Sequence, residues 1–119
     1  MVPKLVPLIR AGFIDYLVST GANLYHDLHY SLGYRLHRSR PRVDDTELRR
    51  RGLVRIYDIV LDFEEVLLRT DALLREILTK PEFQHEMGTA ELHHRLGRYT
   101  DAAERKFGTR GRSVLAAAY

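Results

Sequence analysis

Arginine side chains are concentrated in one short stretch of the sequence. Residues 35–55, which we call the basic corner, hold eight arginines, one histidine and no lysine. The guanidinium group is planar and permanently charged, and it binds phosphate or carboxylate through two parallel hydrogen bonds. Anion binding, above all phosphate binding, is therefore the chemistry that this stretch predicts.

Arginines of the C-terminal part could extend the same surface. Residues 92–119 carry six basic and two acidic side chains, and His93 and His94 precede the first of these arginines. A surface of this kind would neutralise phosphates without reading base sequence. The candidate nucleic-acid-binding residues are Arg35, Arg38, Arg40, Arg42, Arg49, Arg50, Arg51, Arg55, Arg95, Arg98, Arg110 and Arg112.

The charge pattern also allows a second interpretation. Residues 56–91 carry nine acidic and three basic side chains, so the basic corner could form ion pairs with them, within the chain or between subunits. Heat-adapted proteins build such networks and avoid thermolabile side chains. The chain has one asparagine (Asn23), one glutamine (Gln84) and no cysteine. We therefore expect a thermophilic source, and ion pairing stays open beside nucleic-acid binding.

Histidine and glutamate are spaced for metal binding at two places. Residues 82–85 and 91–94 both read Glu-x-x-His, as in di-iron helix bundles, which need two further glutamates from other long helices. The two motifs are nine residues apart, on either side of Gly88, and residues 1–36 offer no matching glutamate. We expect no metal and no cofactor. His26 and His29 are expected to be surface imidazoles.

The other residues that carry chemistry do not suggest an enzyme. Without cysteine there is no thiolate nucleophile or thiolate zinc site, and the four serines assemble no catalytic triad. The tyrosines of residues 16–34 could stack on bases beside arginines, but their spacing favours half-buried packing. No apolar run approaches the roughly 20 residues of a membrane span, and we expect no signal peptide.

Helical periodicity predicts the elements that hold these residues. Apolar positions at steps of three and four over residues 5–36 indicate one long helix, or two shorter ones meeting at Gly21. Pro41 interrupts the helix, and Asp44 begins a new one. Apolar residues over 53–78 predict a central helix, and a short piece over 82–87 ends at Gly88. Thr89 can cap a last helix, which carries apolar residues at helical spacing up to Phe107.

These elements predict an all-α fold: one domain over residues 1–119, built as a long-helix hairpin or bundle of three to five helices with little or no β-structure. The tail, residues 108–119, ends in the apolar sequence Val-Leu-Ala-Ala-Ala-Tyr. We expect this end either to dock on a neighbouring subunit or to pack on its own domain.

A basic proline corner between long apolar helices, arginine-rich and cysteine-free composition, and a small apolar end together resemble the coat proteins of filamentous DNA viruses of hyperthermophilic archaea. The resemblance implies a subunit that polymerises around duplex DNA held in A-form, in a virion or in the host cytoplasm during assembly, with or without a second coat protein. The alternatives are a small dimeric DNA- or RNA-binding accessory or regulatory protein, with a helix-turn-helix around Gly88, and a module that binds an acidic protein.

Overall fold

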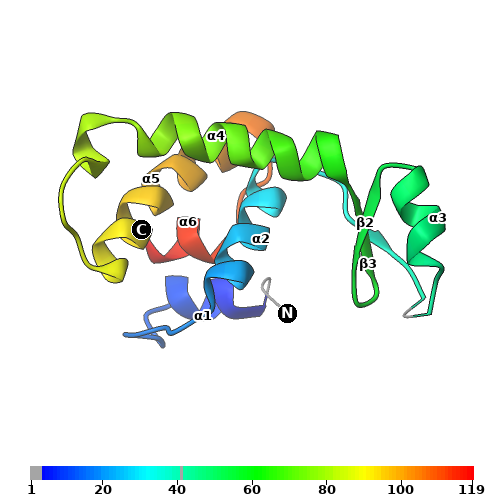
Figure 1. Cartoon of the computed structure of the whole chain (residues 1–119). Coiled ribbons are helices and arrows are strands. Elements are labelled where there is room, and N and C mark those ends of the chain that lie inside the picture. The colour runs from blue at the N-terminus through cyan, green and yellow to red at the C-terminus, as the bar shows by residue number, and fades with distance from the viewer. Residues whose placement is uncertain (1–3, 41) are drawn as a thin grey trace.

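Helices make up most of the structure, a computed structural model that describes residues 4–40 and 42–119. Helix α4 (Arg69–Leu78) runs along one side of the molecule, and α5 (Thr89–Phe107), α2 (Gly21–Ser31) and α6 (Val114–Ala118) lie beneath it, with α1 (Leu5–Arg10) at the bottom of the view (Figure 1). The short helix α6 packs against α1, α2 and α5. No helix in the described part of the chain is long and apolar enough to cross a membrane.

A small antiparallel sheet lies to one side of the helices (Figure 1). Its strands are β1 (His37–Arg38), β2 (Leu53–Ile56) and β3 (Ile59–Asp62), in the order β1-β3-β2. Helix α3 (Asp45–Arg50) packs beside β2. A two-residue turn joins β2 to β3, and its first residue, Tyr57, has a φ of 58°.

The sheet overturns the all-α prediction. Residues 53–78 were expected to form one helix, but the first ten form the β2–β3 hairpin, and helix begins only at Phe63, with the π-helical turn η2 (Phe63–Leu68) leading into α4. The hairpin residues are mainly valine, isoleucine and leucine. A short apolar run of this kind has no periodicity that separates a buried strand from a buried helix, and the β-branched side chains favour the strand.

The N-terminal region forms two helices rather than one. Helix α1 ends at Arg10, Gly12 adopts a φ of 74°, and the chain is then extended up to α2, which begins at Gly21. The two-helix alternative is therefore right about Gly21, but it missed the ten residues between the helices. Three side chains of this extended segment, Phe13, Tyr16 and Val18, are 77%, 80% and 80% exposed.

Several local predictions are confirmed. Asp44 caps α3 by accepting hydrogen bonds from the backbone N–H groups of Thr46 and Glu47, at 2.8 and 3.4 Å. The last long helix was also expected and spans Thr89–Phe107, but its N-cap is Gly88 and not Thr89. Gly88, however, precedes that helix instead of ending one, and only a single 3₁₀ turn, η3 (Pro81–Phe83), forms before it.

The apolar C-terminal end packs on its own chain. Val114, Leu115 and Ala116 are buried, which confirms that this end is not loose and favours the second of the two expectations for it. Two buried carboxylates fix this end in place. Asp27 of α2 accepts from the Ser113 hydroxyl and from two backbone N–H groups of α6, and Glu104 of α5 accepts from three successive backbone N–H groups of residues 111–113.

Candidate functional site

A chain of hydrogen bonds connects two histidines of α2 with a threonine of α4. His26 Nδ1 lies 3.1 Å from His29 Nε2, and His29 Nδ1 lies 3.0 Å from Thr70 Oγ1. Thr70 in turn donates to the backbone carbonyl oxygen of Val66 at 2.7 Å. His29 and Thr70 are fully buried, whereas His26 is half-buried. We call His26, His29 and Thr70 the histidine relay.

The hydrogen bond that Thr70 donates determines which atoms donate and which accept in the histidine relay. The single O–H of Thr70 is used on Val66, so Thr70 Oγ1 accepts from His29 Nδ1–H. A neutral imidazole has one donor and one acceptor, so His29 Nε2 accepts from His26 Nδ1–H. His26 then keeps Nε2 as an acceptor, on the partly exposed side of the relay. The arrangement presents one basic nitrogen of defined tautomer.

The surroundings keep the histidine relay uncharged at neutral pH. Burial is the main cause that lowers the pKa of His29 to about 4. The neighbouring His26 adds to this shift, and Asp71 opposes it. Burial also lowers the pKa of His26. Beside them, Tyr25 donates to Asp71 Oδ1 at 2.8 Å, and burial together with this carboxylate raises the pKa of Tyr25, so the phenol keeps its proton.

The sequence prediction missed this cluster. His26 and His29 were expected at the surface, but His29 has no exposed area. The spacing of three residues did place both imidazoles on one face of a helix. Nothing in the sequence pointed to Thr70 or Asp71 as partners, because they follow by more than forty residues and lie on a helix whose start was misplaced.

The twelve candidate arginines lie on separate elements instead of one continuous surface. Arg38 is on β1, Arg49 and Arg50 on α3, Arg55 on β2, and the others on α5 or in loops. Five of the twelve form ion pairs with carboxylates of this chain. These pairs are Arg38–Asp58 (3.5 Å), Arg50–Glu47 (3.7 Å), Arg55–Asp45 (2.8 Å), Arg95–Glu91 (2.6 Å) and Arg98–Glu82 (2.6 Å).

These pairs favour the ion-pair interpretation for five of the candidates. The other seven are exposed: Arg35, Arg40, Arg42, Arg49, Arg51, Arg110 and Arg112.

The two Glu-x-x-His motifs use their carboxylates in ion pairs. Glu82 accepts hydrogen bonds from Tyr99 and Arg98, and these bonds lower the pKa of its carboxyl group. Glu91 binds Arg95 and lies 3.3 Å from His85 Nε2. Among residues 4–40 and 42–119, no three His, Asp or Glu side chains gather in a way that could hold a metal ion.

Comparison with known proteins gives a consistent family assignment. Residues 3–119 match the family model described as deoxyhypusine synthase. The chain is 57% identical over 118 residues to the deoxyhypusine synthase-like protein of Cyanothece sp., which covers 99% of this chain and 29% of that protein. It is 52% identical to the corresponding protein of Nostoc sp., with 99% and 30% covered. A probable deoxyhypusine synthase 2 of Archaeoglobus fulgidus is 42% identical over 73 residues, 61% of this chain and 24% of that protein. The chain thus spans about 30% of the length of its cyanobacterial relatives.

These matches overturn the coat-protein interpretation and what it implied. The relatives carry the name of an enzyme family and are cellular proteins, so the predictions of a non-enzyme, of a nucleic-acid partner with self-assembly into a filament, and of a location in a virion are wrong. The accessory-protein alternative is wrong for the same reason. Arginine-rich composition misled because it reports charge and not what the charge binds. The chain belongs to the deoxyhypusine synthase family.

Proposed function

We propose that this chain forms part of an enzyme with the activity that its relatives are named for, the formation of deoxyhypusine. The observation that carries the proposal is the 57% identity with the Cyanothece protein over 118 residues. Because the match covers 29% of that protein, we propose the activity for the longer arrangement in which such a segment works. It is not proposed for these 119 residues by themselves.

The surface of the chain supports this arrangement. The extended residues 13–20 expose Phe13, Tyr16 and Val18 almost completely. Tyr16 and Val18 also border a hollow whose other side is formed by Leu24 and Leu115. A contiguous apolar patch of this kind marks a contact surface. It suits packing against further polypeptide of the kind that the longer relatives contain.

Within the proposed enzyme, we assign proton transfer to His26. Its Nε2 carries a lone pair at the partly exposed end of the histidine relay, and His29 fixes its tautomer by accepting from Nδ1–H. An imidazole oriented by a second buried group is a common form of general base. A proton taken up at Nε2 would leave the hydrogen bond to His29 intact.

A chimera tests the proposal. The matching 118 residues of the Cyanothece protein would be replaced by this chain, and deoxyhypusine would be measured by amino-acid analysis of hydrolysed protein from cells that make either version. We expect the chimera to form deoxyhypusine at a level comparable with the parent. A folded but inactive chimera beside an active parent would contradict the proposal, and so would the absence of deoxyhypusine with both.

The role of His26 is tested in the same chimera. His26→Gln should lower the rate of deoxyhypusine formation by roughly 100-fold, the usual lower range for loss of a general base. The matched control, His94→Gln, changes an exposed histidine of α5 and should have little effect. Equal rates for the two variants would remove His26 from the mechanism.

A further inference from the structure

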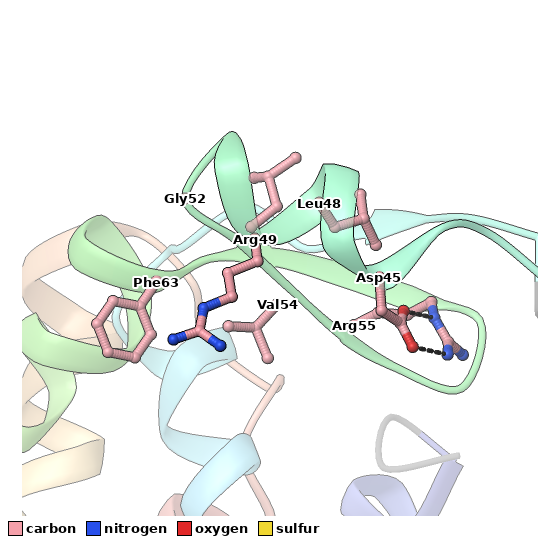
Figure 2. A pocket seen from close by; sticks show the side chains of 8 residues that line it. Asp45, Leu48, Arg49, Gly52, Val54, Arg55 and Phe63 are labelled. Atoms are coloured by element: carbon pink, nitrogen blue, oxygen red, sulfur yellow. Dashed lines mark hydrogen bonds and ion pairs between the residues drawn. The ribbon is translucent and has the colours of Figure 1, made fainter.

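An open hollow lies between α3 and the β2–β3 hairpin, away from the histidine relay. Its volume is about 620 Å³. Leu48 of α3 is buried at its base, whereas Phe63 remains 44% exposed on its rim. Figure 2 shows these side chains around the space. The lining residues are Asp45, Leu48, Arg49, Gly52, Leu53, Val54, Arg55 and Phe63.

The hollow adjoins an open edge of the sheet. Strand β2 pairs with β3 on one side, and β1 pairs with the other side of β3, so β2 is an edge strand. Phe63 N–H donates to the Gly52 carbonyl oxygen at 2.9 Å, and hydrogen-bonded pairs alternate along an antiparallel ladder. The backbone groups of Leu53 and Arg55 therefore point away from β3. Within the described residues, no backbone hydrogen bond is formed on that side.

One arginine gives the hollow a positive charge. Arg49 extends its guanidinium group between Val54 and Phe63 (Figure 2). Arg55, in contrast, is neutralised by two hydrogen bonds of 2.8 Å to the carboxylate oxygens of Asp45, and it also donates to the Tyr57 carbonyl oxygen. The surrounding basic corner holds eight arginines and three acidic residues. An occupant that carries negative charge would therefore be attracted to the hollow.

We propose that the open edge of β2 and the adjoining hollow form a docking groove for an extended, acidic segment of a partner protein. The segment would add a strand by bonding the backbone groups of Leu53 and Arg55, as peptides do at other exposed sheet edges. The side chains at alternate positions of the segment would enter the hollow, apolar ones against Val54 and Phe63 and a carboxylate against Arg49. This proposal does not depend on the proposed activity.

The β2 edge, the apolar hollow and Arg49 act together, so the bound segment must be extended, apolar in part and acidic. An edge strand alone accepts any extended chain, and an apolar hollow alone accepts any apolar group. The guanidinium of Arg49 adds the selection for a carboxylate. Side chains alternate between the two faces of a strand, and Arg49, Val54 and Phe63 line the same hollow. An acidic and an apolar residue should therefore stand two positions apart in the bound segment.

The test uses the full chain and a fluorescent pentapeptide with blocked ends, Val-Thr-Glu-Thr-Val, which places valine and glutamate on one face and is called the valine–glutamate peptide. We expect saturable binding that weakens with added salt, because it depends on an exposed charge. Arg49→Gln should weaken binding roughly tenfold or more, the usual effect of losing a charge-assisted hydrogen bond. Arg110→Gln is the matched control, since Arg110 is exposed in a loop outside the groove and its loss should leave binding unchanged.

Two further peptides separate charge selection from strand addition. A valine–lysine peptide, with lysine in place of the glutamate, should bind at least tenfold more weakly, because Arg49 repels it. A valine–glutamate peptide methylated at alternate backbone nitrogens should bind as weakly, because it has lost the donors to β2. The proposal would be overturned if the valine–glutamate peptide showed no saturable binding, or if either of the two further peptides bound as tightly as it does. Equal effects of Arg49→Gln and Arg110→Gln would overturn it as well.

Discussion

The buried histidine of the relay should make the protein sensitive to mild acid. In the unfolded chain His29 takes up a proton near pH 6.5, but in the folded protein its pKa is lowered to about 4. Between these values the unfolded state binds one more proton than the folded state. The contribution of His29 to the free energy of unfolding is therefore complete above pH 6.5, and it is lost as the pH falls toward 4.

The size of this effect follows from the two pKa values. A difference of one unit corresponds to about 1.4 kcal/mol, so the shift of His29 from 6.5 to about 4 gives a total loss of about 3 kcal/mol. At pH 5 about 2 kcal/mol of this should already be lost, because the unfolded histidine is then almost fully protonated. His29 has no exposed area, so solvent screening reduces the effect little.

Urea unfolding at pH 7 and pH 5, followed by circular dichroism, measures the effect. The difference in unfolding free energy between wild type and His29→Gln should shrink by about 2 kcal/mol between the two pH values, because glutamine does not titrate in this range. His37→Gln changes an exposed histidine of β1 and should retain the wild-type loss. A wild-type advantage over His29→Gln that stays constant from pH 7 to pH 5 would refute the linkage.

Three other substitutions probe the parts that hold the molecule together. Glu104→Gln should lower the unfolding free energy, measured with urea, by about 2–4 kcal/mol, because a buried carboxylate loses charge-assisted bonds to three backbone N–H groups. Gly97→Ala should cost about 1–3 kcal/mol and loosen α6 in hydrogen exchange, since its Cβ would lie 2.7 Å from the Leu115 carbonyl oxygen. Tyr57→Gly should raise the free energy of unfolding by about 0.5–1 kcal/mol, and the melting temperature with it, because glycine adopts a φ of 58° without strain.

Sequence patterns predicted elements well where a local signal marked their ends. Asp44 was recognised as a cap because an acidic residue followed by glutamate three positions later is a local signal, and the structure confirms the bond. The helix Thr89–Phe107 has a long periodic stripe, and it was also predicted correctly. Both features depend on residues within a few turns of each other.

The hairpin and the extended segment 13–20 were missed because their conformation depends on partners distant in sequence. Val60 and Leu61 lie in β3, whose second partner, β1, comes more than twenty residues earlier. A hydrophobic run of this length reads equally well as helix or strand. The buried carboxylates were missed for the same reason, since Asp27 meets the N-terminus of α6 across 86 to 88 residues.

Arginine content could not predict function because the same side chain serves two purposes in this chain. Arg55 donates from Nε and Nη2 to the two carboxylate oxygens of Asp45 and so holds α3 against β2. Arg49, in the same helix as Asp45, extends over an apolar hollow beside an open strand edge. A count of charges treats the two alike. The position of a carboxylate opposite Arg55 distinguishes them, and that position is set by the fold, which brings residues 45 and 55 together.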